Sequence, residues 1–177
     1  MSKLVLNGDT SGSVTLDAPA VSGTTILTLP VQTGTVMVNG PAFRAAPTGT
    51  QTLTVNVLTK IQFQTKVFDT NTNYDNVTNY RFTPTVAGYY QVTAGASAQS
   101  TSSANAILTA VYKNGSLYEF GSAVPCSTNS FGYSQVTTLV YFNGSSDYIE
   151  SYAQATGASG TVVCNGTYFQ AAMVRGA

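Results

Sequence analysis

Few side chains in this 177-residue chain have the chemistry of a catalytic site. There is no histidine, which excludes a histidine-based triad and any metal site built on imidazole. The seven carboxylates are scattered along the sequence, at Asp9, Asp17, Asp69, Asp75, Glu119, Asp147 and Glu150. We therefore expect no catalytic residues and no enzymatic activity.

One polar loop has the residue types of a calcium site. Asp69 and Asp75 flank a segment that also contains Asn71, Asn73 and Asn76. Carboxylate and amide oxygens at this spacing could hold Ca²⁺, a cation that prefers oxygen ligands. The alternative is a set of turns in which the Asp and Asn side chains bind nearby backbone N–H groups. We favour the turns and expect no cofactor beyond this calcium candidate.

Charged residues make up only 8% of the chain, against about 25% in a typical soluble domain. The seven basic residues form no cluster, and because nucleic-acid binding needs clustered Lys and Arg, we expect no nucleic-acid partner. The N-terminus lacks an apolar core of signal-peptide length, and no window approaches a membrane span. This combination favours a protein made in the host cytoplasm and released by lysis in a virus particle.

Residues 1–40 differ from the rest of the chain. Short β-type clusters recur between turn-forming residues, at positions 4–6, 14–16, 26–29 and 36–38. Each is too short to bury much apolar surface alone, so we expect them to pack against copies from neighbouring chains. The alternative is a flexible arm. A segment often found ahead of the distal domains of bacteriophage fibre proteins resembles residues 11–16, 25–30 and 32–37.

Residues 41–177 consist of short alternating runs separated by Gly, Pro and Asn-Gly turns. In the stretch 89–99, Tyr90 and Val92 belong to an apolar parity, as in a strand with one buried face. Asn114-Gly115 predicts a two-residue hairpin turn, because both residues tolerate positive φ. No segment shows helical periodicity over three turns. We predict an all-β domain of about ten strands, arranged as a sandwich or barrel.

A series of motifs in residues 41–176 is more specific. The residues that carry it are Pro41-Ala-Phe43, Phe63, Phe68-Asp69, Asn73-Tyr74-Asp75, Tyr80-Arg-Phe-Thr-Pro84, Ala87-Gly-Tyr-Tyr90, Lys113-Asn-Gly115, Gly144, Asp147-Tyr148-Ile149 and Gly166-Thr-Tyr-Phe169. In this order they resemble the globular head of complement subcomponent q, a jelly roll shared with tumour necrosis factor. The resemblance implies a two-sheet antiparallel sandwich that assembles as a tight homotrimer. It does not fix function, because the family hosts cytokines, complement heads and viral knobs.

The resemblance also bears on the cysteines and on calcium. In such a jelly roll the loops with Cys126 and Cys164 lie at the same end of the sandwich, which allows a disulfide between them. Two unpaired, partly buried thiols are the alternative. In the family, the position similar to Cys126 often pairs with a cysteine that this chain lacks. Some relatives bind calcium near the trimer apex, which adds some weight to the site at Asp69 and Asp75.

The chain has eleven tyrosines and no tryptophan. Tyrosine suits a contact between chains because it combines apolar area with a polar tip. Our candidates for the trimer interface are Tyr90, Tyr133, Tyr141, Tyr152 and Phe169. The loops with Tyr74 or Tyr118 could instead stack on a glycan.

These observations predict a structural virion protein, the trimeric fibre or spike of a bacteriophage. Residues 1–40 would attach it to other virion proteins, and the jelly-roll head, residues 41–177, would bind a host-surface glycan or protein. One alternative is a capsid decoration protein that stabilises the particle without recognising a host. Another is a secreted lectin-like binding module.

Overall fold

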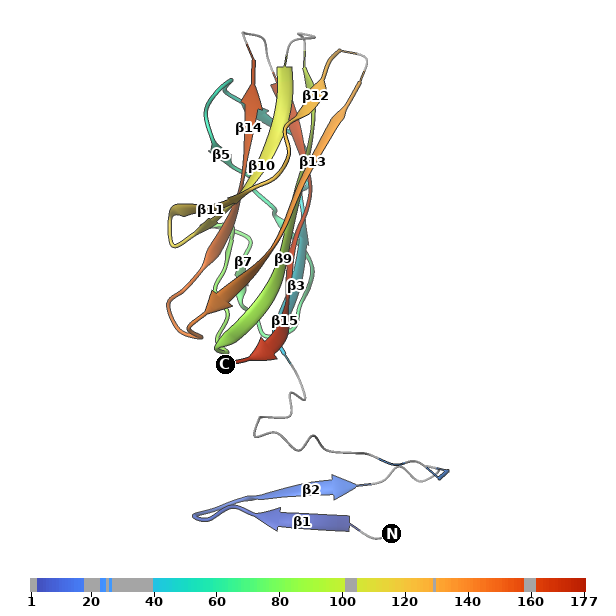
Figure 1. Cartoon of the computed structure of the whole chain (residues 1–177), viewed down its shortest axis with the longest axis vertical. Helices are drawn as coiled ribbons and strands as arrows, with labels where there is room; N and C mark the ends of the chain where they lie inside the picture. The colour runs from blue at the N-terminus through green and yellow to red at the C-terminus, as the bar shows by residue number, and fades with distance from the viewer. Residues whose placement is uncertain are drawn as a thin grey trace. The chain divides into compact units, whose positions relative to one another are not determined.

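The computed structural model of the chain describes residues 3–17, 23–24, 26, 40–100, 105–128, 130–157 and 162–177. The chain divides into two compact units, Met1–Thr35 and Val36–Ala177. In the first unit, β1 (Lys3–Asn7) and β2 (Ser13–Asp17) pair as an antiparallel hairpin (Figure 1). Every residue from 4 to 17 is exposed. The β-type clusters predicted at 26–29 and 36–38 lie outside the described residues, apart from Ile26.

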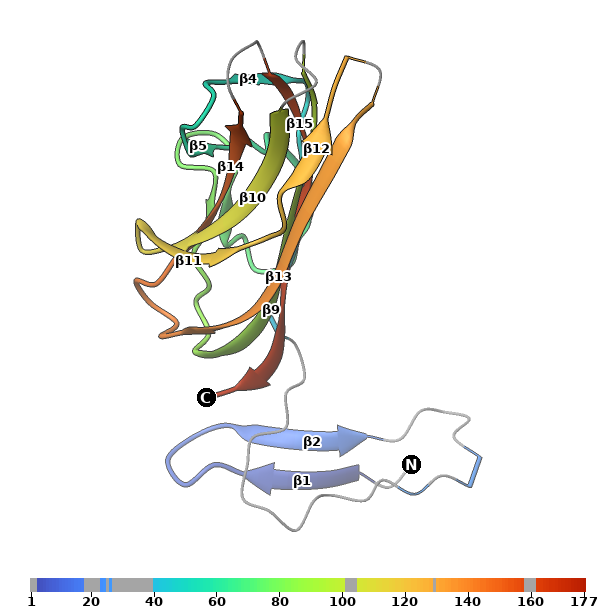
Figure 2. The same cartoon turned by 45° about the horizontal axis from the view of Figure 1, so that its top comes forward.

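The second unit is a sandwich of two antiparallel sheets (Figure 1, Figure 2). One is a six-stranded sheet with the order β13-β9-β15-β3-β6, in which β4 pairs with β15. Its strands are β3 (Ala42–Ala46), β4 (Gln51–Leu53), β6 (Thr65–Asp69), β9 (Gly88–Ser100), β13 (Gly132–Phe142) and β15 (Val162–Gly176).

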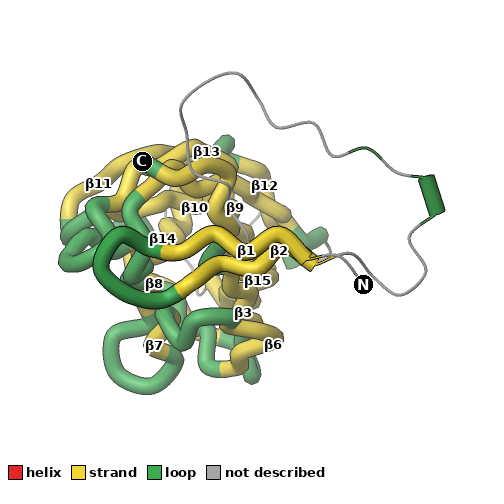
Figure 3. The backbone as a smooth tube through the Cα atoms, turned by 90° about the horizontal axis from the view of Figure 1, so that it is seen from below, coloured by secondary structure: helices red, strands yellow, loops and turns green. Residues whose placement is uncertain are grey.

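The other is a seven-stranded sheet with the order β11-β10-β14-β8-β7, in which β12 pairs with β10 and β5 pairs with β14. Its strands are β5 (Thr59–Lys60), β7 (Tyr74–Asp75), β8 (Arg81–Phe82), β10 (Asn105–Lys113), β11 (Ser116–Phe120), β12 (Val124–Cys126) and β14 (Ile149–Thr156). Figure 3 looks along the strands of both sheets. Among the described residues there is no helix that could cross a membrane.

The predicted all-β antiparallel sandwich is therefore confirmed. The described part of this unit has thirteen strands instead of about ten, and the excess comes from strands of two or three residues: β4, β5, β7, β8 and β12. Such strands are too short to show an alternating pattern in the sequence.

Strand β9 lies between β13 and β15 in the six-stranded sheet. It pairs with β13 over residues 88–98 and with β15 over residues 88–100. The apolar parity expected from the sequence faces the other sheet, and its members are at most 1% exposed: Tyr90, Val92, Ala94, Ala96 and Ala98. Alternation along one strand thus identified one side of the core.

Aromatic rings fill one part of the space between the sheets. Phe43 stacks on Phe82 and Tyr74 at centroid distances of 4.4 and 4.7 Å, and meets Phe169 edge-on at 5.0 Å. Each such pair contributes about 0.5–1.5 kcal/mol beyond the burial of its apolar area. The cluster joins β3 and β15 of one sheet to β7 and β8 of the other.

The predicted turn at Asn114-Gly115 connects β10 to β11, and both residues have positive φ, at 52° and 77°. These are the angles that a two-residue hairpin of this hand requires. The Asn114 side chain also donates to Asp147 Oδ1 at 2.8 Å and accepts from the Tyr148 N–H at 2.9 Å, which anchors the turn to the neighbouring loop.

Candidate functional site: a tyrosine ridge and a hollow on one sheet

Where β13 pairs with β9, the outward face of the six-stranded sheet carries large exposed apolar side chains towards both ends of the pairing, with Gln135 and Thr137 between them. Along β13, Tyr133, Leu139 and Tyr141 point away from the core, because Val140 and its parity mates point inward. Tyr89 lies opposite Tyr141 in register, and their ring centroids are 5.4 Å apart. We call Tyr89, Tyr133, Leu139 and Tyr141 the tyrosine ridge.

The tyrosine ridge is open to solvent in the single chain. Its four residues are 43–64% exposed, and none of them carries a charge. Phe131, which is 48% exposed, extends the apolar surface beside Tyr133. Exposed tyrosine and leucine side chains without charge are typical of a contact with another protein.

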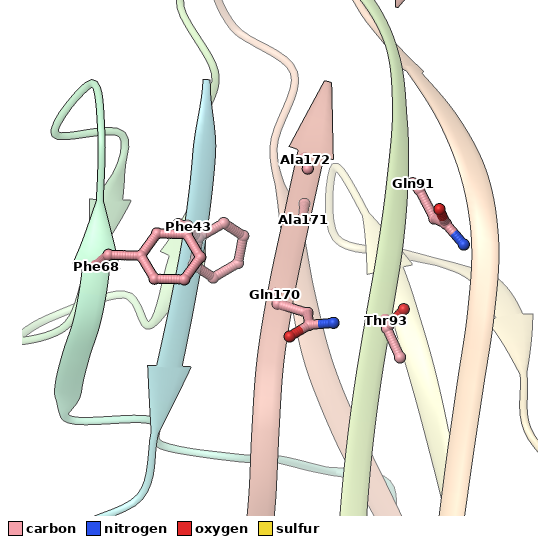
Figure 4. Close-up of a pocket in the computed structure, with 7 residues that line it drawn as sticks. All are labelled: Phe43, Phe68, Gln91, Thr93, Gln170, Ala171 and Ala172. Carbon is pink, nitrogen blue, oxygen red and sulfur yellow. The ribbon is translucent and has the colours of Figure 1, made fainter. Parts of the chain in front are cut away.

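A hollow of about 270 Å³ lies on the same sheet, next to the ridge (Figure 4). Gln91 and Thr93 of β9 line it on the ridge side, in register with Leu139 and Thr137 of β13. Phe68 of β6 lines it on the far side.

Small residues account for this hollow. Ala171 and Ala172 of β15 line it and do not fill the space between Phe68 and Gln91 (Figure 4). Gln170, also in the lining, accepts a hydrogen bond from Arg44 Nη1 at 2.6 Å. The guanidinium of Arg44 is therefore engaged, and it also lies 4.8 Å from the Tyr168 ring centroid.

Two predicted interface residues belong to the ridge, Tyr133 and Tyr141. The prediction is wrong for Tyr90 and Phe169, which are completely buried within the head and have no surface to offer a second chain. The Tyr90 hydroxyl donates to the Val86 carbonyl at 2.8 Å, and burial raises its pKa to about 12.

Tyr152 is on β14 of the seven-stranded sheet, so the structure does not bring it together with the ridge. Its ring stacks on Tyr112 at a centroid distance of 4.1 Å. Sequence reasoning missed Tyr89 and Leu139. A usable signal was present, because the parity that places Tyr90 and Val92 inside places Tyr89 outside.

The loop with Asp69 and Asp75 has the structure of hydrogen-bonded turns. Asp69 accepts from the Asn73 and Tyr74 N–H groups at 2.9 and 3.0 Å, and from Lys66 Nζ at 3.1 Å. Backbone hydrogen bonds, led by the one from Thr78, hold the pKa of the Asp75 carboxyl well below its usual range. Among the described residues there is no group of three or more His, Cys, Asp or Glu that could hold a metal ion.

Cys126 and Cys164 are both free and buried, so the structure has the thiol alternative and not the disulfide. Burial raises the pKa of the Cys164 thiol to about 12 and also raises that of Cys126. Because the thiolate is the reactive form, burial lowers the reactivity of both side chains.

The two tyrosines considered for glycan stacking differ in accessibility. Tyr74 is buried, and its hydroxyl donates to the Phe63 carbonyl at 3.2 Å, so its ring cannot stack on a sugar. Tyr118 is 44% exposed and donates to the Leu139 carbonyl at 3.0 Å. Its contact with a glycan stays a prediction.

No protein-family model and no curated protein sequence matches this chain. Solved structures do match it. The globular domain of zebrafish complement 1qA protein has a TM-score of 0.56 at 14% identity, covering 77% of this chain and 99% of that chain. Murine APRIL has a TM-score of 0.56 at 8% identity, with coverages of 77% and 100%. The PRD1 vertex protein P5 has a TM-score of 0.50 at 16% identity, with coverages of 77% and 96%.

At identities of 8–16%, these structural matches show a shared fold and no more than that. The outward ridge and hollow are therefore carried by a jelly roll of the complement 1q and tumour-necrosis-factor type, as the sequence motifs implied.

Proposed function

We propose that this chain is a non-enzymatic, homotrimeric structural protein of a bacteriophage particle. Its head projects from the particle and binds the host surface, and its N-terminal segment attaches it to other virion proteins. The observation that supports this best is the tyrosine ridge beside a hollow on one sheet of a jelly roll. The resemblance of the N-terminal segment to phage fibre proteins supports the proposal that the chain is part of a bacteriophage particle.

The ridge and the hollow explain how copies associate. They lie side by side on one sheet, so the ridge of one chain can enter only the hollow of another. Such a contact joins two different patches, and it closes into a ring when the rotation between copies allows it. The resemblance to trimeric jelly-roll heads favours a ring of three copies. Covering the exposed half of each ridge side chain contributes on the order of 1 kcal/mol.

Paired cysteine variants test the contact. Leu139→Cys and Ala172→Cys chains are co-expressed, oxidised and separated without reductant. A disulfide between the two different variants is expected, and Leu139→Cys alone should give none. A Leu139→Cys chain that cross-links to itself would instead show that ridge meets ridge, and would contradict the proposed contact.

Binding to cells tests the proposal that the head attaches to the host surface. Labelled full-length protein is incubated with the cells on which the particle grows, and separately with particles that lack the protein. Cell binding that saturates supports host attachment. Binding to particles without any binding to cells would favour the capsid-decoration function and overturn the receptor-binding one.

A further inference from the structure

A polar basin of about 320 Å³ lies on the seven-stranded sheet, where β7 pairs with β8. Its lining consists of three threonines, two asparagines, Asp75, Arg81 and the buried Tyr74. The volume is at the lower end of the range for ligand pockets, about 300–1,000 Å³. The basin therefore has room for one ring-sized ligand.

Hydrogen bonds within the protein hold the walls of the basin in place. Asp75 accepts from three consecutive backbone N–H groups, those of residues 77–79, at 2.9–3.1 Å, and from the Asn79 side chain at 2.8 Å. On the other side, Asn73 Nδ2 donates to a carbonyl of its own loop at 3.1 Å. The site is thus formed before any ligand arrives, which lowers the entropy cost of binding.

Other polar groups of the lining are still available. In the described part of the chain, no hydrogen bond engages the Thr72 and Thr83 hydroxyls or Asn79 Oδ1. The Arg81 guanidinium has neither a hydrogen bond nor an ion pair there, and lies over the Tyr148 ring at 4.4 Å from its centroid. The basin therefore offers two hydroxyls that donate and accept, one carbonyl acceptor and one planar set of donors.

Charges around the basin cancel. Arg81 lies in register with Asp75 on one side and with Glu150 on the other. Glu150 in turn pairs with Lys60, whose Nζ is 2.5 Å from Glu150 Oε1. Two cations and two carboxylates leave no net charge to favour a charged ligand, so we expect recognition to depend on hydrogen bonds.

The geometry points to a binding site for one neutral pyranose sugar residue in this basin. Adjacent hydroxyls of such a ring both donate and accept, which matches the mixture of free threonine, amide and guanidinium groups. Arg81 of β8 and Thr83, which follows this strand, are the residues that would position the sugar by hydrogen bonds. The inference rests on the proposed function in two respects. That function supplies the source of the sugar, a host-surface glycan, and the three copies that would give avidity.

Saturation-transfer NMR on the full-length protein tests the site, with methyl glycosides of galactose, glucose and mannose at millimolar concentration. N-acetylneuraminic acid and inorganic phosphate are the charged probes. The Thr83→Val and Arg81→Lys variants each remove hydrogen bonds, whereas Thr52→Val changes an exposed strand threonine on the other sheet. Loss of one hydrogen bond should weaken binding about fivefold, and Thr52→Val should leave it unchanged.

Saturable binding of at least one neutral sugar, weakened in both basin variants, supports the inference. No binding of any neutral sugar, stronger binding of a charged probe, or equal binding by all variants would overturn it. Folding of each variant is checked by its melting temperature, and the two basin variants check one another.

The cell assay is run on the same samples. Cell binding without sugar binding overturns this inference alone, and sugar binding without cell binding overturns only the host-attachment proposal.

Discussion

On the six-stranded sheet the outward parity carries Tyr89, Leu139 and Tyr141, whereas on the seven-stranded sheet it carries Lys60, Glu150 and Arg81. Both faces follow from the same alternation of side chains along a strand. They differ in how far their large outward side chains are covered by other side chains of the same chain.

On the seven-stranded sheet several large outward side chains of β8 and β14 have a partner. Tyr152 stacks on Tyr112, Arg81 covers Tyr148, and Glu150, which is 4% exposed, is paired with Lys60. On the six-stranded sheet the ridge side chains have neighbours too, since Phe131 lies beside Tyr133 and Lys113 Nζ is 6.0 Å from the Tyr141 ring centroid, but they remain 43–64% exposed. Tyrosine therefore occurs on both faces, and what differs between them is how far its ring is exposed in the single chain.

A charge in the ridge should produce the largest effect. Leu139→Lys would place an ammonium in the covered contact, where an uncompensated buried charge costs roughly 3–5 kcal/mol. We expect a folded monomer by light scattering. The control is Gln154→Lys, the same new charge at an outward position of β14, and it should remain trimeric. If Leu139→Lys also stays trimeric, the ridge is not the interface.

The neighbouring tyrosines of β9 sharpen the comparison. Tyr90→Ala empties a buried site and should lower the free energy of unfolding by about 3–5 kcal/mol. Tyr89→Ala should change the stability of the single chain much less but should weaken association. Urea unfolding and mass in solution, both measured over a range of protein concentrations, separate the two effects. Equal loss of stability in both variants would contradict the inside–outside assignment.

Removal of the charge at Glu150 should weaken the fold and leave the assembly intact. Lys60 is 32% exposed in its side chain and can be rehydrated, so the cost of Glu150→Gln should be about 1–2 kcal/mol of unfolding free energy. Urea unfolding measures it, and light scattering should still give a trimer. Dissociation into monomers would mean that the seven-stranded sheet takes part in the contact.

The smallest effect concerns the free energy of unfolding at acidic pH. The Asp75 carboxyl has a pKa below its usual value in the folded chain, so its stabilising contribution is complete above the unfolded pKa of about 3.9. That contribution is lost as the pH falls below this value towards the lowered folded pKa. Asp75→Asn should therefore flatten the acid limb of the stability curve, measured by urea unfolding at several pH values. An unchanged acid limb would show that the turn does not stabilise the carboxylate.

The sequence predicted the parts of the fold that repeat over many residues. Alternation identified the faces of β9, and Asn114-Gly115 identified a hairpin turn. Strands such as β7 and β8, with two residues each, have no period to detect.

The candidate site was predicted only in part. Tyr133 and Tyr141 were found because they are aromatic, and Tyr90 was wrongly included for the same reason. Tyr74, expected in a surface loop, turns inward because Phe43 stacks on its ring and the Phe63 carbonyl accepts from its hydroxyl. The hollow was not predictable, since its shape depends on strands far apart in the sequence.

The mass of the full-length chain in solution at micromolar concentration tests the central claim most directly. A trimeric mass that falls to that of one chain in Leu139→Lys is the predicted result. A stable monomer of the unaltered chain, with the tyrosine ridge open to solvent, would contradict it.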